Sequence, residues 1–224
     1  MSIIRIREFL LASYHDLPNI LFVGALLLGS LTGYLPLVWV AFGILLNGVT
    51  ISFVQTVLEM LFPTWGQLFQ EDVSSACMTG FLHVRSLKEA PGSLPRRMVA
   101  PSQWLAATVF FATFSIYNSI RVAIRPSAKG TDMEQINNRR AFSLSAFVIG
   151  IVFFLLVMSR ILTGCETKLG GFLGVLFGGG IAIGYWHLLD LCGSGRVPDI
   201  LQVVGAMAPD AKNPDTPVMC VPEE

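Results

Sequence analysis

The chain has 224 residues, of which 53% are hydrophobic and 13% are charged. Soluble globular proteins carry roughly a quarter charged residues, so this composition excludes an ordinary soluble core and indicates a membrane protein. The 15 basic and 15 acidic residues cancel, which leaves no electrostatic basis for binding nucleic acid.

The first 16 residues combine apolar and charged side chains. Arg5, Arg7 and Glu8 interrupt the apolar run and no small-residue cleavage site follows, which is unlike a secretory signal. We expect residues 1–16 to form a short amphipathic segment that lies at the membrane interface.

Apolar stretches of the length needed to cross a bilayer, about 20 residues, occupy most of residues 17–191. The first long stretch divides at residues 33–36, where "GYLP" interrupts it. The expected fold class is all-α: a polytopic transmembrane helical bundle of about five spans, in contact with the lipid bilayer. The predicted spans lie near 17–34, 36–61, 103–124, 141–162 and 169–191.

Two polar segments flank the later spans. Pro91, Gly92 and Pro95 prevent a continuous helix in the 64–102 loop, and the 193–224 tail holds five further prolines and should be extended. We expect the loop and the tail to contact protein partners. The number of chains in the assembly is left open.

The last predicted span carries glycines at a spacing of four. Gly170, Gly174 and Gly178 form one such series, and Gly180 and Gly184 form another. Small residues at this spacing let a second backbone approach closely. The series predicts either dimerisation or packing against other spans of the same chain.

Cysteine and histidine do not form a metal-binding pattern. The four cysteines lack Cys-x-x-Cys spacing, so neither a zinc site nor a redox pair is expected, and no cofactor is expected. His187 and Asp190 lie three residues apart but form an incomplete ligand set, so we interpret them as interfacial polar residues. Glu59 is either a functional group within its span or reaches water.

Basic residues gather at 121–125 and 139–140, on either side of the loop that follows the third span. Arg121, Arg125, Arg139 and Arg140 could bind anionic lipid or an acidic partner, or could be a solvated surface.

Three short sequences carry a family resemblance. "SRILTGCETKLGG" has Ser159 and Arg160, then Glu166, then Gly170; "PSQW" begins at Pro101 and contains Ser102 and Trp104; "QTVLEMLFP" runs from Gln55 to Phe62 and Pro63. In this order they resemble the three motifs of the phosphatidic acid phosphatase and dolichyl diphosphatase superfamily. A second placement of the first motif uses Lys88, Pro95 and Arg96. Under the five-span interpretation, the three sequences share one face of the membrane.

The resemblance implies a helical membrane phosphatase whose chemistry has been lost. In the family, a third-motif histidine attacks phosphorus and a second-motif histidine protonates the leaving group. Here Glu166 and Trp104 take those positions, and Gly170 takes that of the orienting aspartate. We therefore expect no catalytic residues. Ser102, Ser159 and Arg160 remain as a candidate site for an anionic headgroup, unless Arg160 only reaches the lipid surface without specificity.

Two functions are consistent with the sequence. The first is a catalytically inactive, phosphatidic acid phosphatase-like protein that acts as a structural or partner-docking element, in an endomembrane or in the inner membrane of a virion. The second is an active lipid phosphatase or phosphotransferase that uses Glu166 or His83 in altered chemistry.

Overall fold

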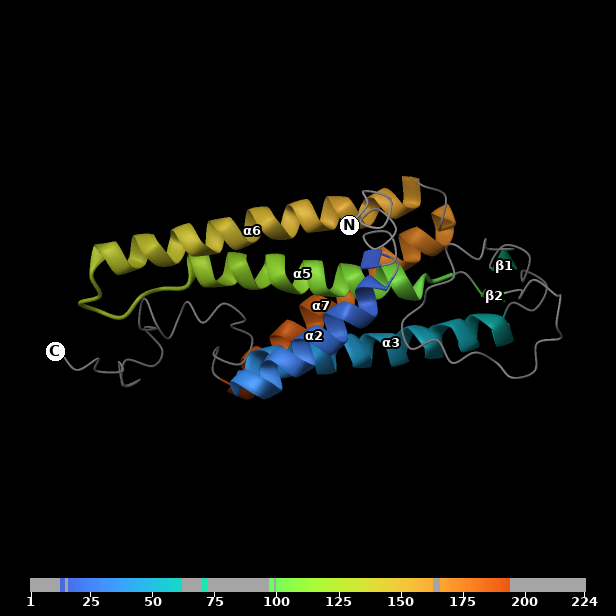
Figure 1. The fold of residues 1–224 in the computed structure, drawn as a ribbon, viewed down its shortest axis with the longest axis horizontal. Coiled ribbons are helices and arrows are strands. Elements are labelled where there is room, and N and C mark those ends of the chain that lie inside the picture. Colours follow the sequence, from blue (N-terminus) through green and yellow to red (C-terminus); the bar gives the residue numbers. More distant parts are fainter. Residues whose placement is uncertain are drawn as a thin grey trace, which may run out of the picture.

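The computed structural model describes residues 13–14, 16–61, 70–71, 97–98, 100–162 and 166–193. Long helices make up most of these ranges (Figure 1): α2 (Leu17–Thr32), α3 (Leu35–Leu61), α5 (Gln103–Ile124), α6 (Met133–Leu162) and α7 (Lys168–Gly193). One pair of two-residue strands, β1 (Gln70–Glu71) and β2 (Arg97–Met98), runs antiparallel. Most of the predicted 1–16 segment, most of the 64–102 loop and the tail after Gly193 lie outside the described residues.

The helical prediction is confirmed: the described part of the chain forms a bundle of long apolar helices. Four helices in the described part of the chain, α3, α5, α6 and α7, are long and apolar enough to cross a membrane, which indicates an integral membrane protein. The predicted 17–34 span is only the 16-residue helix α2. At a rise of 1.5 Å per residue, α2 extends about 24 Å, less than the roughly 30 Å of bilayer hydrocarbon.

Backbone conformation at Gly33 explains why α2 ends early. This residue has φ of 68°, in the left-handed region that glycine adopts without steric cost. Helix α3 then begins at Leu35 and packs back along α2. Gly29 allows this packing, because a Cβ atom there would come within 2.8 Å of Val38 Cγ2.

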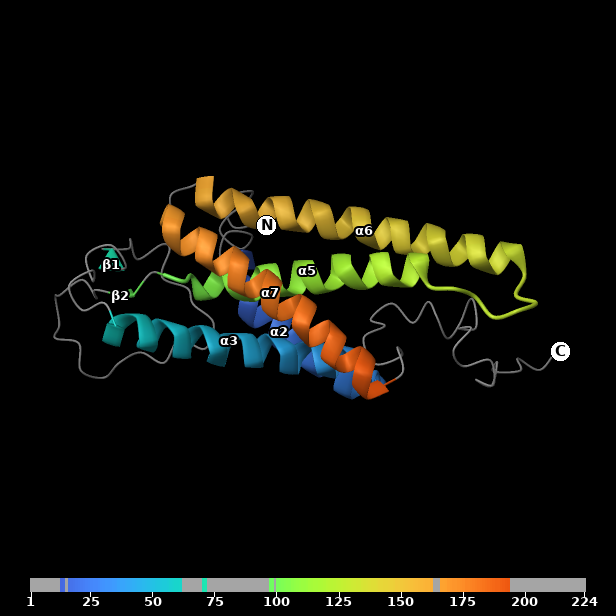
Figure 2. The same cartoon turned by 180° about the vertical axis from the view of Figure 1, so that it is seen from behind.

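Helix α5 lies at the centre of the bundle. It packs against α6 on one side and against α7 and α3 on the other (Figure 2). Helix α6 packs mainly against α5 and leaves much of its apolar surface exposed. The arrangement buries α5 most fully among the four long helices.

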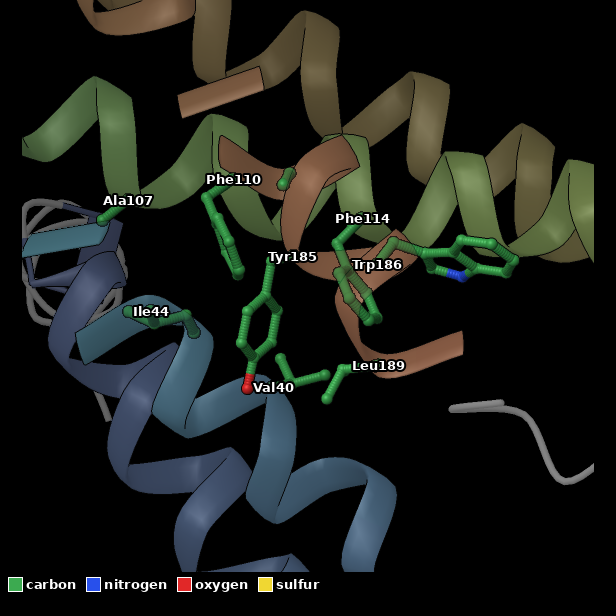
Figure 3. Close-up of a cluster of buried hydrophobic side chains, with 9 residues drawn as sticks. Val40, Ile44, Ala107, Phe110, Phe114, Tyr185, Trp186 and Leu189 are labelled. Carbon is green, nitrogen blue, oxygen red and sulfur yellow. The ribbon is translucent and has the colours of Figure 1, made fainter. Parts of the chain in front are cut away.

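An aromatic core joins α3, α5 and α7 (Figure 3). The Tyr185 ring lies 5.9 Å from that of Phe110, and the Tyr185 hydroxyl donates to the Trp39 carbonyl at 2.8 Å. Both rings also lie against Gly43, where a side chain would collide with them. The buried members of this core are Val40, Ile44, Ala107, Phe110, Phe114, Ala182, Tyr185, Trp186 and Leu189.

Glycines of α7 divide between an inner and an outer face. A Cβ atom at Gly174 would lie 3.0 Å from the Ser102 carbonyl oxygen, and one at Gly178 would collide with the backbone of Ala106. Packing within the chain therefore accounts for these two. Gly180 and Gly184 face open space, so packing among the described helices does not require glycine at either position.

Helix α6 starts earlier than hydropathy predicts. It begins at Met133 rather than near residue 141, and the Asp132 carboxylate accepts a hydrogen bond from the Glu134 amide. The added turns are polar, so a search for apolar runs does not detect them. The other boundaries agree closely, and α5 occupies the predicted 103–124 range.

Candidate functional site

The predicted motif positions meet at one end of the bundle. This end holds the C-terminal turns of α3 and α6 and the N-terminal turns of α5 and α7 (Figure 1). Phe62 and Pro63 of the first motif lie outside the described residues, as do Lys88, Pro95, Arg96 and His83. The remaining motif positions, from Gln55 to Gly170, can be placed individually.

Ser102 fixes the start of α5 to the start of α7. Its side-chain oxygen caps α5 by accepting from the Leu105 amide at 3.2 Å. Its own amide donates to the Gly170 carbonyl at 3.0 Å. Gly170, where the resemblance places an aspartate, therefore contributes a backbone acceptor and no side chain.

Gln55 connects α3 to the same junction. Its side-chain nitrogen donates to the Pro101 carbonyl at 2.8 Å, and its side-chain oxygen accepts from Gln103 at 3.0 Å. The Gln103 amide also reaches the Ser52 hydroxyl at 3.1 Å. At the position where the resemblance places a lysine, Gln55 is thus an uncharged amide that holds backbone in place.

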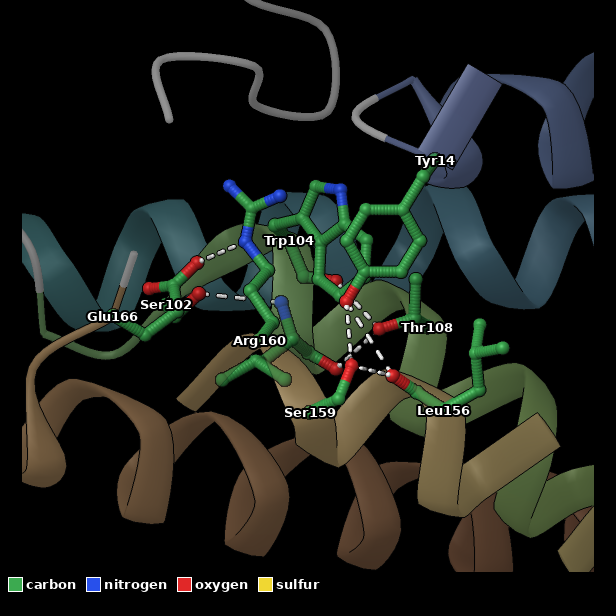
Figure 4. A network of polar contacts seen from close by, with 9 residues as sticks. Tyr14, Ser102, Trp104, Thr108, Leu156, Ser159, Arg160 and Glu166 are labelled. Carbon is green, nitrogen blue, oxygen red and sulfur yellow. Dashed lines mark hydrogen bonds and ion pairs between the residues drawn. The ribbon is translucent and has the colours of Figure 1, made fainter. Parts of the chain in front are cut away.

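Arg160 lies at the middle of the junction, with only 1% of its side chain exposed. Its Nε donates to Glu166 Oε1 at 3.0 Å, and its Cζ lies 4.3 Å from the centre of the Trp104 ring (Figure 4). The guanidinium is thus ion-paired on one side and stacked on an indole on the other. We call Ser102, Trp104, Arg160 and Glu166 the Arg160 junction.

The Glu166 side chain is 7% exposed. Burial raises the pKa of this carboxyl above its ordinary value of 4.5, because the charged form loses hydration. A hydrogen bond from Ser102, and the charge and hydrogen bond of Arg160, act in the opposite direction. Burial therefore outweighs the two groups that favour the charged form, of which only Arg160 carries an opposite charge.

Ser159 belongs to a different set of contacts. Its hydroxyl donates to the Leu156 carbonyl at 2.6 Å and lies 3.4 Å from the Tyr14 hydroxyl (Figure 4). The Tyr14 ring lies 5.3 Å from Trp104 and covers its far side. Sequence reasoning did not identify Tyr14, because it lies in the segment assigned to the membrane interface and belongs to no motif.

The other singled-out residues lie elsewhere. Glu59 is exposed near the end of α3. At the opposite end of the bundle, His187 bonds to the Tyr117 hydroxyl at 2.9 Å and Asp190 pairs with Arg125 at 3.3 Å. Within the described ranges, no three His, Cys, Asp or Glu side chains come close enough to share a metal ion.

No family model, no curated protein and no solved structure matches this chain. The phosphatidic acid phosphatase resemblance therefore depends on the motif residues and on their common location.

Proposed function

We propose that this chain is a non-catalytic integral membrane protein, a structural or partner-docking element built on a degenerate phosphatidic acid phosphatase-like bundle. The observation that supports this proposal is the Arg160–Glu166 pair. The arginine that would hold a substrate phosphate is buried and bound to a carboxylate of its own chain, with a separation of 3.0 Å. The junction then serves to join helix ends.

Charge and proton transfer both oppose phosphatase chemistry at this position. A phosphate dianion would have to displace Glu166 from Arg160 and would then lie beside that carboxylate. Trp104 offers only an indole N–H, which donates a hydrogen bond but does not transfer a proton in catalysis. Loss of one transition-state donor alone typically costs about 100- to 1000-fold in rate, and loss of the nucleophile costs more.

Partner docking is proposed from the sequence. The polar 64–102 loop and the proline-rich 193–224 tail are long hydrophilic segments attached to a small bundle. They would offer surfaces to proteins outside the bilayer. The compartment is proposed to be an endomembrane or the inner membrane of a virion, where small membrane proteins without activity serve as scaffold parts.

The test is a phosphate-release assay on the purified full-length protein in detergent. Phosphatidate and a polyprenyl diphosphate are the substrates, and an active lipid phosphatase serves as the positive control. We expect release no faster than in protein-free samples. Arg160→Ala should lower thermal stability without changing this baseline.

An altered phosphatase is the competing function, because Ser102, Arg160 and Glu166 do meet. Arg160 would first have to release Glu166, whose carboxylate would then attack phosphorus and form an acyl phosphate as the P–O bond to the lipid breaks; the lipid oxygen would take a proton from water, and a second water would hydrolyse the acyl phosphate and release phosphate. Phosphate release that disappears in both Arg160→Ala and Glu166→Gln, while Arg140→Ala keeps it, would establish this activity and overturn our proposal. Arg140 is an exposed arginine of the same helix, so it controls for charge loss.

A further inference from the structure

The end of the bundle opposite the Arg160 junction carries a basic and aromatic cluster. It combines the last turns of α5 and α7 with the first turns of α6. We call it the Arg121 cluster, and its members are Arg121, Arg125, Arg139, Trp186, His187 and Asp190.

Trp186 is a fixed platform within this cluster. Its side chain is buried, its indole N–H donates to Asn118 Oδ1 at 3.2 Å, and Tyr117 packs edge-on at 5.1 Å. The Arg121 Cζ lies 5.1 Å from the centre of the Trp186 ring. A guanidinium in cation–π contact keeps its N–H donors at the edge, where they suit the oxygens of a phosphate.

Arg125 and Arg139 hold the neighbouring backbone in place. Arg125 pairs with Asp190 of α7 at 3.3 Å. Arg139, which is buried, donates to the Arg125 carbonyl and to the Ser127 hydroxyl, the latter at 2.8 Å. The last turn of α5 is therefore connected to both α6 and α7. Because these side chains and the backbone are already ordered, a ligand that binds here loses less free energy to ordering them.

Positive charge exceeds negative charge at this end. The cluster contains three arginines and one aspartate, a formal balance of +2 among the described residues. Lys129 and Arg140 are offset by Asp132 and Glu134 in the adjoining turn and first turns of α6, so the balance over the described residues of this end is also +2. Beside a low-dielectric bilayer, such an excess attracts anions.

Exposed apolar side chains adjoin the same cluster. Ile124, one turn after Arg121, is 68% exposed, and Leu191, one turn after His187 on α7, is 84% exposed. These positions belong to helices that could cross a membrane. A ligand that carries both a phosphate and hydrocarbon chains would contact the basic and the apolar residues together.

We propose that the Arg121 cluster binds the headgroup of an anionic phospholipid, with Arg121 contacting the phosphate, Arg125 held nearby by Asp190, and Ile124 and Leu191 contacting the acyl chains. A lipid accounts for the apolar surface beside the arginines, whereas an acidic protein segment accounts only for the charge.

The experiment measures thermal unfolding of the full-length protein in neutral detergent during titration with phosphatidylglycerol. Phosphatidylcholine, inorganic phosphate and polyglutamate are titrated in parallel. Phosphatidylglycerol should raise the unfolding temperature, and the other three should have little effect. Arg121→Gln should weaken the apparent affinity by about fivefold, as expected for one basic residue near an anionic membrane surface, and Arg121→Lys should lie between it and wild type.

Arg140→Gln is the matched control, because it removes the same charge from an exposed position at the same end. It should retain nearly all of the phosphatidylglycerol effect. The proposal is overturned if phosphatidylcholine stabilises equally, if inorganic phosphate or polyglutamate reproduces the effect, or if the Arg121 variants and Arg140→Gln lose affinity to the same extent. If Arg121→Gln does not fold, the apparent affinities of Arg121→Lys and Arg140→Gln for phosphatidylglycerol are compared instead. Arg121→Lys should bind more weakly than Arg140→Gln, and equal affinities would overturn the proposal.

Discussion

Replacing Arg160 with leucine should show how much the Arg160 junction contributes to stability. The substitution removes the 3.0 Å ion pair with Glu166 and the cation–π contact with Trp104. Removing one partner of a buried pair typically costs about 3–5 kcal/mol. Glu166 can relieve part of this cost by taking up a proton, so we expect a loss of about 3 kcal/mol at neutral pH.

The assay is thermal unfolding in detergent, followed by tryptophan emission. For a protein of this size, 1 kcal/mol shifts the midpoint by about 2–4 °C, so the expected decrease is roughly 6–12 °C. Arg140→Leu, at an exposed position of the same helix, should change stability by no more than about 0.5 kcal/mol. Adding Glu166→Gln to Arg160→Leu should restore part of the loss, because no buried charge is then left without its arginine.

The effect of Arg160→Leu should also depend on pH. Without Arg160, the pKa of Glu166 should rise further above its ordinary value of 4.5, since the arginine acts to lower it. A raised pKa in the folded state contributes stability below the unfolded pKa, and that stability is lost as pH rises through the folded pKa. The deficit relative to wild type should therefore be smallest below pH 4.5 and grow toward pH 7. A variant as stable as wild type, or a deficit that does not vary with pH, would refute this account.

The remaining predictions concern unfolding temperature. Gly178→Ala should destabilise by about 1–3 kcal/mol, because its methyl group would collide with the α5 backbone, whereas Gly180→Ala faces open space and should change little. Ser102→Ala removes the cap of α5 and should cost about 1 kcal/mol. Asn47 is buried, and neither its side-chain nitrogen nor its side-chain oxygen has a hydrogen-bond partner within the described residues, so Asn47→Leu should be neutral or stabilising. Asn118→Leu should destabilise, because it removes the acceptor of the Trp186 indole N–H. An Asn47→Leu variant that unfolds well below wild type, or equal effects within the glycine pair, would contradict these expectations.

Hydropathy predicted most of the fold because lipid imposes a simple requirement on each spanning segment. A run such as 103–124 must satisfy its backbone hydrogen bonds internally, so its length and apolarity suffice to predict α5. At 17–34 the helix is shorter than hydropathy predicts, because the left-handed turn at Gly33 ends α2 at Thr32. Hydropathy also missed the first turns of α6, which are polar.

The sequence indicated at which end of the bundle the candidate residues lie, but not which of their side chains touch one another. Sequence order and the expected topology placed residues 101–104 and 159–166 at one end, and the described parts of both meet there. The stacking of Arg160 on Trp104 and the approach of Tyr14 depend on how three separate segments pack. Neither spacing nor composition contains that information, because the contacts join residues far apart in the chain.

The central position of α5 has a consequence for biosynthesis. This helix is the least apolar of the four long helices, and Thr108, Asn118 and Ser119 are buried along it. During synthesis it must enter the lipid before α7, which begins about 40 residues after α5 ends and later covers it. Thr108 and Ser119 donate to carbonyls within α5 itself, whereas the Asn118 amide oxygen accepts from Trp186 of α7. A nascent chain that stops before Lys168 therefore leaves the Asn118 amide without this partner, and α5 should insert less completely than in the full chain.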